Sequence, residues 1–219
     1  MKPTFHPTLV VNLGESAWPD VLTSSYAKRL YTRLHKITGS PSLSRNVVFI
    51  WARLHQLSSF LAAVPAMGTY ILDKSLMSDK FDALERQTLE LIHSEALGNS
   101  PHPAILTAFL NAVFIYMIQN LREVPRGSSI CVTVASRIQS GLELVDIKPL
   151  ISICPDILVW TILVGRSGAI NGPVRYWFNE VVDELASMGF DLPEAIGNLT
   201  YFDVAQRALG READASRGF

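Results

Sequence analysis

This chain of 219 residues has few charged side chains and almost no cysteine. Charged residues make up 18% of it, below the roughly 25% typical of soluble domains, and hydrophobic residues make up 48%. Its two cysteines, Cys131 and Cys154, have no CxxC partner and no histidine at metal-ligand spacing. This excludes a disulfide framework and a zinc module. We expect two buried, reduced thiols and therefore a cytoplasmic or nuclear location.

The sequence also lacks a strong charge of either sign and a long apolar run. The formal net charge is −1 and the basic residues are scattered, so we expect no binding of nucleic acid by this chain alone. The apolar run 157–164 is far shorter than the roughly 20 residues of a membrane-spanning helix. The run 9–11 is too short for the core of a secretory signal. We therefore expect no membrane span.

Familiar catalytic motifs are missing as well. The chain contains no HExxH, GxSxG, P-loop, GxGxxG or DDxxD-like stretch, and its five histidines are well separated. Metalloproteases, serine hydrolases, nucleotide-dependent enzymes and ionising terpene synthases are therefore poor interpretations. We expect no metal and no cofactor.

What the sequence does contain is helical periodicity. Apolar residues recur three and four positions apart through most of the chain, which predicts amphipathic helices. The segments 103–123 and 155–168 are apolar on every side and are expected to be buried. Sustained apolar–polar alternation does not occur, and helix is favoured even at the β-like patch 132–134. Helices are predicted near 19–37, 43–61, 69–76, 78–97, 103–123, 128–145, 155–168, 173–188 and 191–210.

These segments predict an all-α, single-domain multi-helix bundle with two buried central helices. The domain is expected to span residues 1–210. The small, polar residues 211–219 are expected to form a frayed tail.

Three segments carry a resemblance to a known family. They are FDALERQTLELI (81–92), AILTAFLNAVFIYMIQNLREVP (104–125) and ILVWTILVGRSGAINGPVRYWFNEVVDEL (157–185). Their order and hydrophobic pattern resemble the C-terminal regulatory domain of fungal binuclear zinc-cluster transcription factors. The matching residues are Tyr116 with Val124-Pro125, Trp160, and the group Arg175, Trp177 and Phe178.

The resemblance covers about residues 78–210 and implies an all-helical fold and a fungal source. Two features depart from the family. The chain has no cluster of six cysteines, and its apolar helix lacks the Glu and Arg usual near the start. We therefore expect either an auxiliary regulator or a regulator-derived domain turned to another use.

Two functional hypotheses follow. The first is a stand-alone protein of fungal secondary metabolism that encloses an apolar terpenoid or polyketide intermediate and promotes its cofactor-free pericyclic cyclisation, of the Diels–Alder type. Such a reaction needs mainly a folded substrate, because orientation alone supplies roughly 7–11 kcal/mol. The second is a non-enzymatic transcriptional co-regulator or ligand-binding fragment of a zinc-cluster factor, located in the nucleus. A homodimer is compatible with both.

Candidate site residues are polar or aromatic groups set among apolar ones. For catalysis they are Asn111, Tyr116 and His55, and for substrate binding Trp51, Phe114, Trp160 and Arg166. Each also has a structural alternative. Asn111 can link to a neighbouring backbone group, the aromatic rings can be plain core, and Arg166 can bond the last carbonyls of its own helix. Arg175 is expected to pair with Glu180 or Glu184.

Overall fold

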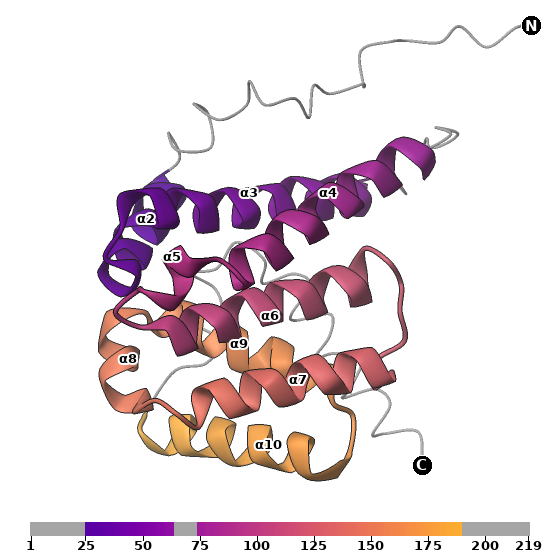
Figure 1. Ribbon diagram of the computed structural model, residues 1–219. Coiled ribbons are helices and arrows are strands. Elements are labelled where there is room, and N and C mark those ends of the chain that lie inside the picture. Colours follow the sequence, from indigo (N-terminus) through magenta and orange to yellow (C-terminus); the bar gives the residue numbers. More distant parts are fainter. Residues whose placement is uncertain (1–24, 64–73, 190–219) are drawn as a thin grey trace, which may run out of the picture.

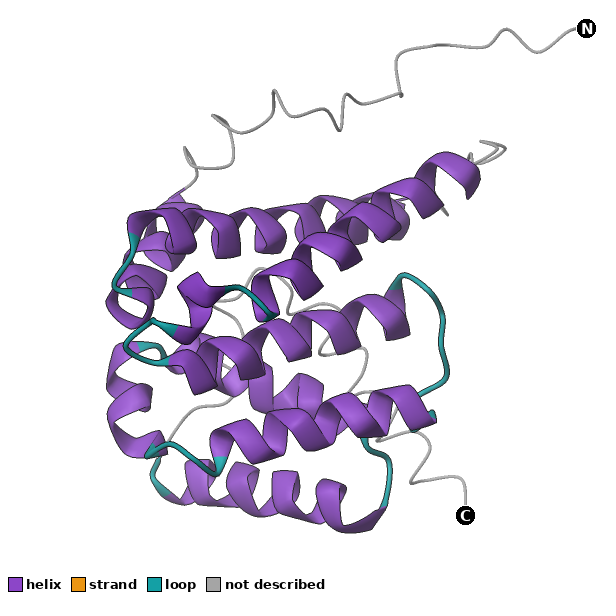
Figure 2. Cartoon of the chain, in the orientation of Figure 1, coloured by secondary structure: helices purple, strands orange, loops and turns teal. Residues whose placement is uncertain are grey.

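The computed structural model describes residues 25–63 and 74–189, and that part of the chain is a bundle of nine helices without a strand (Figures 1 and 2). The predicted all-α fold is confirmed. The helices are α2 (Ser25–Thr38), α3 (Pro41–Ala63), α4 (Lys74–Ile92), α5 (Glu95–Gly98), α6 (Pro103–Asn120), α7 (Ser129–Leu142), α8 (Ile147–Ile153), α9 (Pro155–Gly168) and α10 (Gly172–Ser187).

The helices lie in layers. In Figure 1, α2, α3 and α4 form one face, α6 and α9 lie in the middle, and α7 and α10 form the opposite face. Helix α6 packs against α4, α7 and α9, and α9 packs against α6, α7 and α10. The two segments predicted to be buried on every side are therefore the two central helices.

Helix α6 shows why the sequence has so few charges. Thirteen of its residues, between Ile105 and Ile118, are buried. Among the described helices α6 alone is long and apolar enough to cross a membrane, and 72% of that stretch lies buried inside the bundle. Its hydrophobicity is that of a core helix surrounded by other helices.

Prolines set the start of the central helices. Pro103 and Pro155 occupy the first turns of α6 and α9, where a missing N–H costs nothing and the fixed φ favours the helix. The predicted bounds 155–168 agree with α9. The β-like patch 132–134 lies inside α7.

Several boundaries differ from prediction. Helix α4 begins at Lys74 and runs without a break through the gap expected between 69–76 and 78–97, and α6 and α7 end at Asn120 and Leu142, three residues short of their predicted ends. The helix expected over 78–97 ends at Ile92, because the Ser94 side chain accepts a hydrogen bond from the Leu97 N–H and begins the separate helix α5. Helix α8 was not predicted. It begins at the cap formed by Asp146, whose carboxylate accepts from the Lys148 N–H. The predicted helix 191–210, the tail 211–219 and most of 69–76 lie outside the described residues.

A buried ion pair joins the first helix to the core. The Arg33 guanidinium of α2 donates to the Asp156 carboxylate at the start of α9. The Asp156 side chain is only 5% exposed and that of Arg33 is 33% exposed. Removing Arg33 would leave the buried Asp156 carboxylate without its cation, so this pair helps to hold α2 on the bundle.

Candidate functional site

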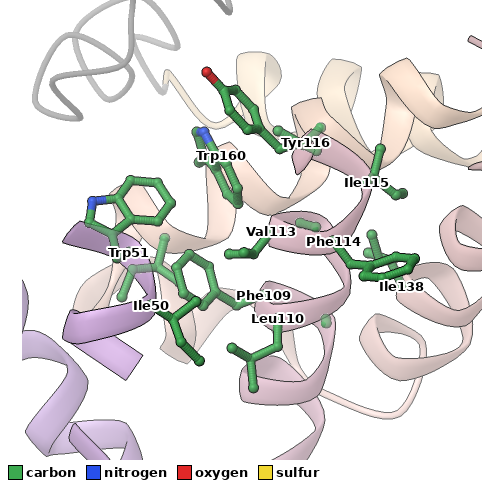
Figure 3. Packing of buried hydrophobic residues seen from close by; sticks show 14 of the residues in the cluster. Ile50, Trp51, Phe109, Leu110, Val113, Phe114, Ile115, Tyr116, Ile138 and Trp160 are labelled. Atoms are coloured by element: carbon green, nitrogen blue, oxygen red, sulfur yellow. The ribbon is translucent and has the colours of Figure 1, made fainter. Parts of the chain in front are cut away.

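Four aromatic rings from three helices meet at the centre of the bundle (Figure 3). They are Trp51 of α3, Phe109 and Tyr116 of α6, and Trp160 of α9. The Trp160 ring centroid lies 4.7 Å from that of Trp51, 5.5 Å from that of Phe109 and 6.0 Å from that of Tyr116. Trp51 meets Trp160 edge to face, an arrangement that aligns the positive ring edge with the negative ring face. We call these four residues the aromatic cluster.

The aromatic cluster contains three of the predicted site residues, Trp51, Tyr116 and Trp160. Phe109 completes it and was not among the candidates. Phe109 and Tyr116 are seven residues apart on α6, and two helical turns return a side chain to nearly the same face. That spacing was the signal in the sequence that could have found Phe109.

Ring-to-ring packing occupies the space between α3, α6 and α9 at this level. No member of the aromatic cluster is more than 4% exposed, and neighbouring centroids lie within 6.0 Å. An apolar substrate was expected among these side chains. Here the rings contact one another, and a molecule seated between them would have to displace at least one ring.

Tyr116 is the titratable member of the aromatic cluster. Burial raises the pKa of its phenol, and the Ser58 side chain of α3 lowers it by a smaller amount. The phenol is therefore protonated at neutral pH and can act as a hydrogen-bond donor but not as a base.

The other candidates on α6 do not join the aromatic cluster. Asn111 is buried, and its amide Nδ2 donates to the Thr107 carbonyl 2.9 Å away, one turn earlier. This is the structural alternative for Asn111, a link to neighbouring backbone. Phe114 lies on the other side of α6, towards Ile138 of α7 (Figure 3). His55 belongs to α3, and its side chain lies outside what the structure describes.

Arg166 and Arg175 join the end of α9 to α10. The Arg166 Nε donates to Asn179 Oδ1 at 2.8 Å, and an Arg175 guanidinium nitrogen donates to the Arg166 carbonyl at 2.7 Å. The carbonyls that end α9 therefore receive a cation from the next helix, where a negative dipole end favours one. Arg175 was expected to pair with Glu180 or Glu184 one or two turns along α10. It bonds across to α9 because the two helices pack closely.

Helices α9 and α10 pack closely at Gly165. A Cβ added there would lie 2.7 Å from the Phe178 Cε1, closer than real Cβ atoms come. Phe178 is fully buried and its ring meets Trp177 edge to face at 5.0 Å. Gly165 thus makes room for the ring of Phe178.

Arg122 forms a second junction, between α4 and the end of α6. Its guanidinium pairs with Asp82 and with Glu85, the latter at 3.5 Å, and also donates to the Ser78 hydroxyl at 3.3 Å. It lies over the Phe81 ring at 5.7 Å. The LREVP exit of one segment that carries the family resemblance is therefore bound to the FDALER start of another.

The described residues contain no candidate metal site. Across residues 25–63 and 74–189, no three His, Cys, Asp or Glu side chains gather closely enough to hold a metal ion. Cys131 and Cys154 are both buried thiols. Burial, with a smaller effect of the Asp156 carboxylate, raises the pKa of Cys154 from 9.0 to about 12. This thiol is a poor nucleophile at neutral pH.

Comparison with protein-family models, curated proteins and solved structures gives no match for this chain.

Proposed function

We propose that this chain is a helical regulatory module of the zinc-cluster transcription-factor type, acting through its surface and not through an internal catalytic site. The observation that carries the proposal is the role of four residues that resemble the family, because each contacts a neighbouring helix. Tyr116 of α6 meets Trp160 of α9, and Trp160 also meets Trp51 of α3. Arg175 and Phe178 join α10 to α9.

When the proteins of a family have only their fold in common, the residues that they share are those that pack helices against one another. An enzyme family would instead share groups that face a substrate. The aromatic cluster supports the same interpretation, because its rings are in mutual contact at the level where a substrate would be enclosed.

A tethering experiment tests this proposal. The chain is fused to an unrelated DNA-binding domain and expressed in yeast with a reporter gene behind the matching operator. We expect reporter expression to differ several-fold from that given by the DNA-binding domain alone. Trp160→Ala should abolish the difference, because it removes the ring that contacts the other three. Lys148→Ala, at an exposed position of α8, is the matched control and should leave it intact.

A fusion that is folded and present in the nucleus, yet leaves the reporter at the level of the DNA-binding domain alone, contradicts the proposal. Immunoblotting and microscopy establish abundance and location. Far-UV circular dichroism of the purified fusion establishes folding.

We keep the cyclase hypothesis as a second candidate because of one observation. Trp51, Trp160 and Tyr116 were chosen from the sequence as pocket residues, and they come from three helices to a single cluster. If one ring swings aside, the remaining aromatic faces and the protonated phenol could hold a conjugated carbonyl compound.

Incubation with linear polyenes that carry a diene and a conjugated carbonyl tests this candidate. A cyclase should change product ratios relative to buffer, and Tyr116→Phe should reduce the rate by about tenfold, the worth of one hydrogen bond to developing charge. Binding should also shift the tryptophan fluorescence. Unchanged fluorescence together with buffer-level product ratios contradicts the candidate.

A further inference from the structure

The helices α2 and α3 carry basic charge only. Between residues 25 and 63 there is no Asp or Glu, while the Lys and Arg residues are Lys28, Arg29, Arg33, Lys36, Arg45 and Arg53. Along the whole sequence the basic residues are scattered, but those of α2 and α3 are brought together in the fold. These two helices pack against each other and, with α4, form one face of the bundle (Figure 1).

Two of these cations are already engaged within the fold. Arg33 binds the Asp156 carboxylate, and the Arg53 guanidinium lies 4.5 Å from the centre of the Phe49 ring. Lys28 and Arg45 differ from them. Both are exposed, and in the described part of the chain neither side chain forms an ion pair or hydrogen bond.

Lys28 and Arg45 line the same pocket. It has a volume of about 480 Å³ and is also lined by Tyr31 and Thr32 of α2. The Tyr31 ring is stacked in parallel on the His35 ring one turn later, with a centroid separation of 6.0 Å, which holds its orientation. The Thr32 hydroxyl donates to the Lys28 carbonyl and can therefore only accept. The donors left for a ligand are an ammonium, a guanidinium and a phenol.

We propose that this pocket binds a small organic oxyanion that carries two negative charges, such as a phosphate ester or a dicarboxylate. A guanidinium offers two parallel N–H donors to such a group, and an ammonium beside it neutralises the second charge. Neither α2 nor α3 carries a carboxylate, so no acidic side chain on these two helices competes with the ligand. The pocket is open to solvent, and the Tyr31 ring in its wall offers an apolar face to the organic part of such a ligand.

This pocket lies on the exposed surface of α2 and α3, whereas the aromatic cluster is buried inside the bundle. Ligand binding in the pocket does not depend on the proposed regulatory function. Either one can fail without the other. A regulator would use the ligand as an effector, but the binding experiment makes no use of transcription.

Isothermal titration calorimetry with the full chain tests the site, with adenosine monophosphate, glucose 6-phosphate, succinate and inorganic phosphate as probes. We expect at least one organic anion to bind more tightly than inorganic phosphate. Affinity should fall several-fold between 50 and 200 mM NaCl, because the two cations are exposed. Comparison of the phosphate esters with succinate distinguishes the two kinds of oxyanion.

Variants that remove the same charge from the pocket or from elsewhere on the surface distinguish a specific binding site from nonspecific attraction of anions. Lys28→Ala and Arg45→Ala should each weaken binding by about tenfold, and the double variant by more. The control is the double variant Lys148→Ala, Arg137→Ala, which removes the same charges from exposed positions of α8 and α7 and should change affinity less than twofold.

Three results would overturn the proposal. The first is that none of the four probes binds to a folded chain. The second is that the site variant and the control variant lose equal affinity. The third is that a DNA duplex binds more tightly than every small anion and is weakened equally by both variants, which would indicate a diffuse basic surface.

Discussion

The Gly165→Ala substitution tests a close contact between α9 and α10. The new methyl group would lie 2.7 Å from the Phe178 Cε1 and closer still to its Cζ, whereas real Cβ atoms essentially never come within 3.0 Å of another heavy atom. The ring cannot simply turn away, because Phe178 is fully buried and lies against Trp177. Either α9 and α10 separate, or the ring shifts and moves its neighbours.

Two effects of opposite sign determine how much Gly165→Ala changes the free energy of unfolding. Overpacking a buried site costs about 1–3 kcal/mol. Replacing glycine by alanine inside a helix contributes about 1 kcal/mol in the other direction. Because Gly165 and Phe178 are both buried and the overlap falls on a ring, overpacking should win. We expect the free energy of unfolding to fall by about 1–2 kcal/mol, and the melting temperature by about 2–4 °C per kcal/mol.

Urea titration followed by far-UV circular dichroism measures the change. Gly98→Ala is the matched control, since a Cβ at that position meets nothing within 4 Å, and stability should stay level or rise. Phe178→Leu removes the ring tip and should cost about 1–2 kcal/mol on its own. Combined with Gly165→Ala, it should cost clearly less than the sum, because the overlap is gone. Additive losses, or a Gly165→Ala variant as stable as the parent, would refute this account of the contact.

Three further predictions concern ionic and thiol groups. Arg33→Ala should lower the free energy of unfolding by about 2–3 kcal/mol in urea titrations, because Asp156 is then buried without its cation; a loss no larger than that of the exposed Lys36→Ala contradicts this. Arg122→Ala should cost about 1 kcal/mol at low salt and less in 0.5 M NaCl, since its carboxylate partners are partly exposed; an effect independent of salt contradicts the ionic account. Burial raises the pKa of Cys154 from 9.0 to about 12, so the unfolded chain loses this thiol proton first as pH rises. Stability should therefore fall between pH 9 and about 12 by about 1.4 kcal/mol per pH unit relative to Cys154→Ala; equal slopes contradict it.

Most of the fold was predictable because the sequence carries it locally. The apolar pattern of 103–120 has no polar side, so it could only be a buried helix, and Pro103 and Pro155 mark where the two central helices begin. Short elements were harder. The seven-residue helix α8 is too brief for periodicity to stand out. The break at Ser94 depends on one side-chain cap that the hydrophobic pattern does not reveal.

The position of a candidate side chain could be predicted only where the residues around it on the same helix determine whether it is buried. Large rings within apolar helices tend to meet at the centre of a bundle, and for that reason Trp51, Trp160 and Tyr116 came together as chosen. The partners of Arg166 and Arg175 depend on how closely α9 and α10 approach. That distance is set by Gly165 against Phe178, a tertiary contact that spacing along one helix cannot reveal.

The low charge content has a physical source in the fold. From composition alone, a larger buried fraction, an apolar cavity or an oligomer interface would each explain it. Helix α6 buries residues on every side, and the rings of the aromatic cluster pack against one another between α3, α6 and α9, so burial accounts for much of the shortage. The charges that the chain does carry are segregated, since α2 and α3 are purely basic. Arg33 stabilises the fold through its bond to Asp156. Lys28 and Arg45 form no such pair among the described residues and like charges repel, so the anionic ligand proposed above would account for their placement.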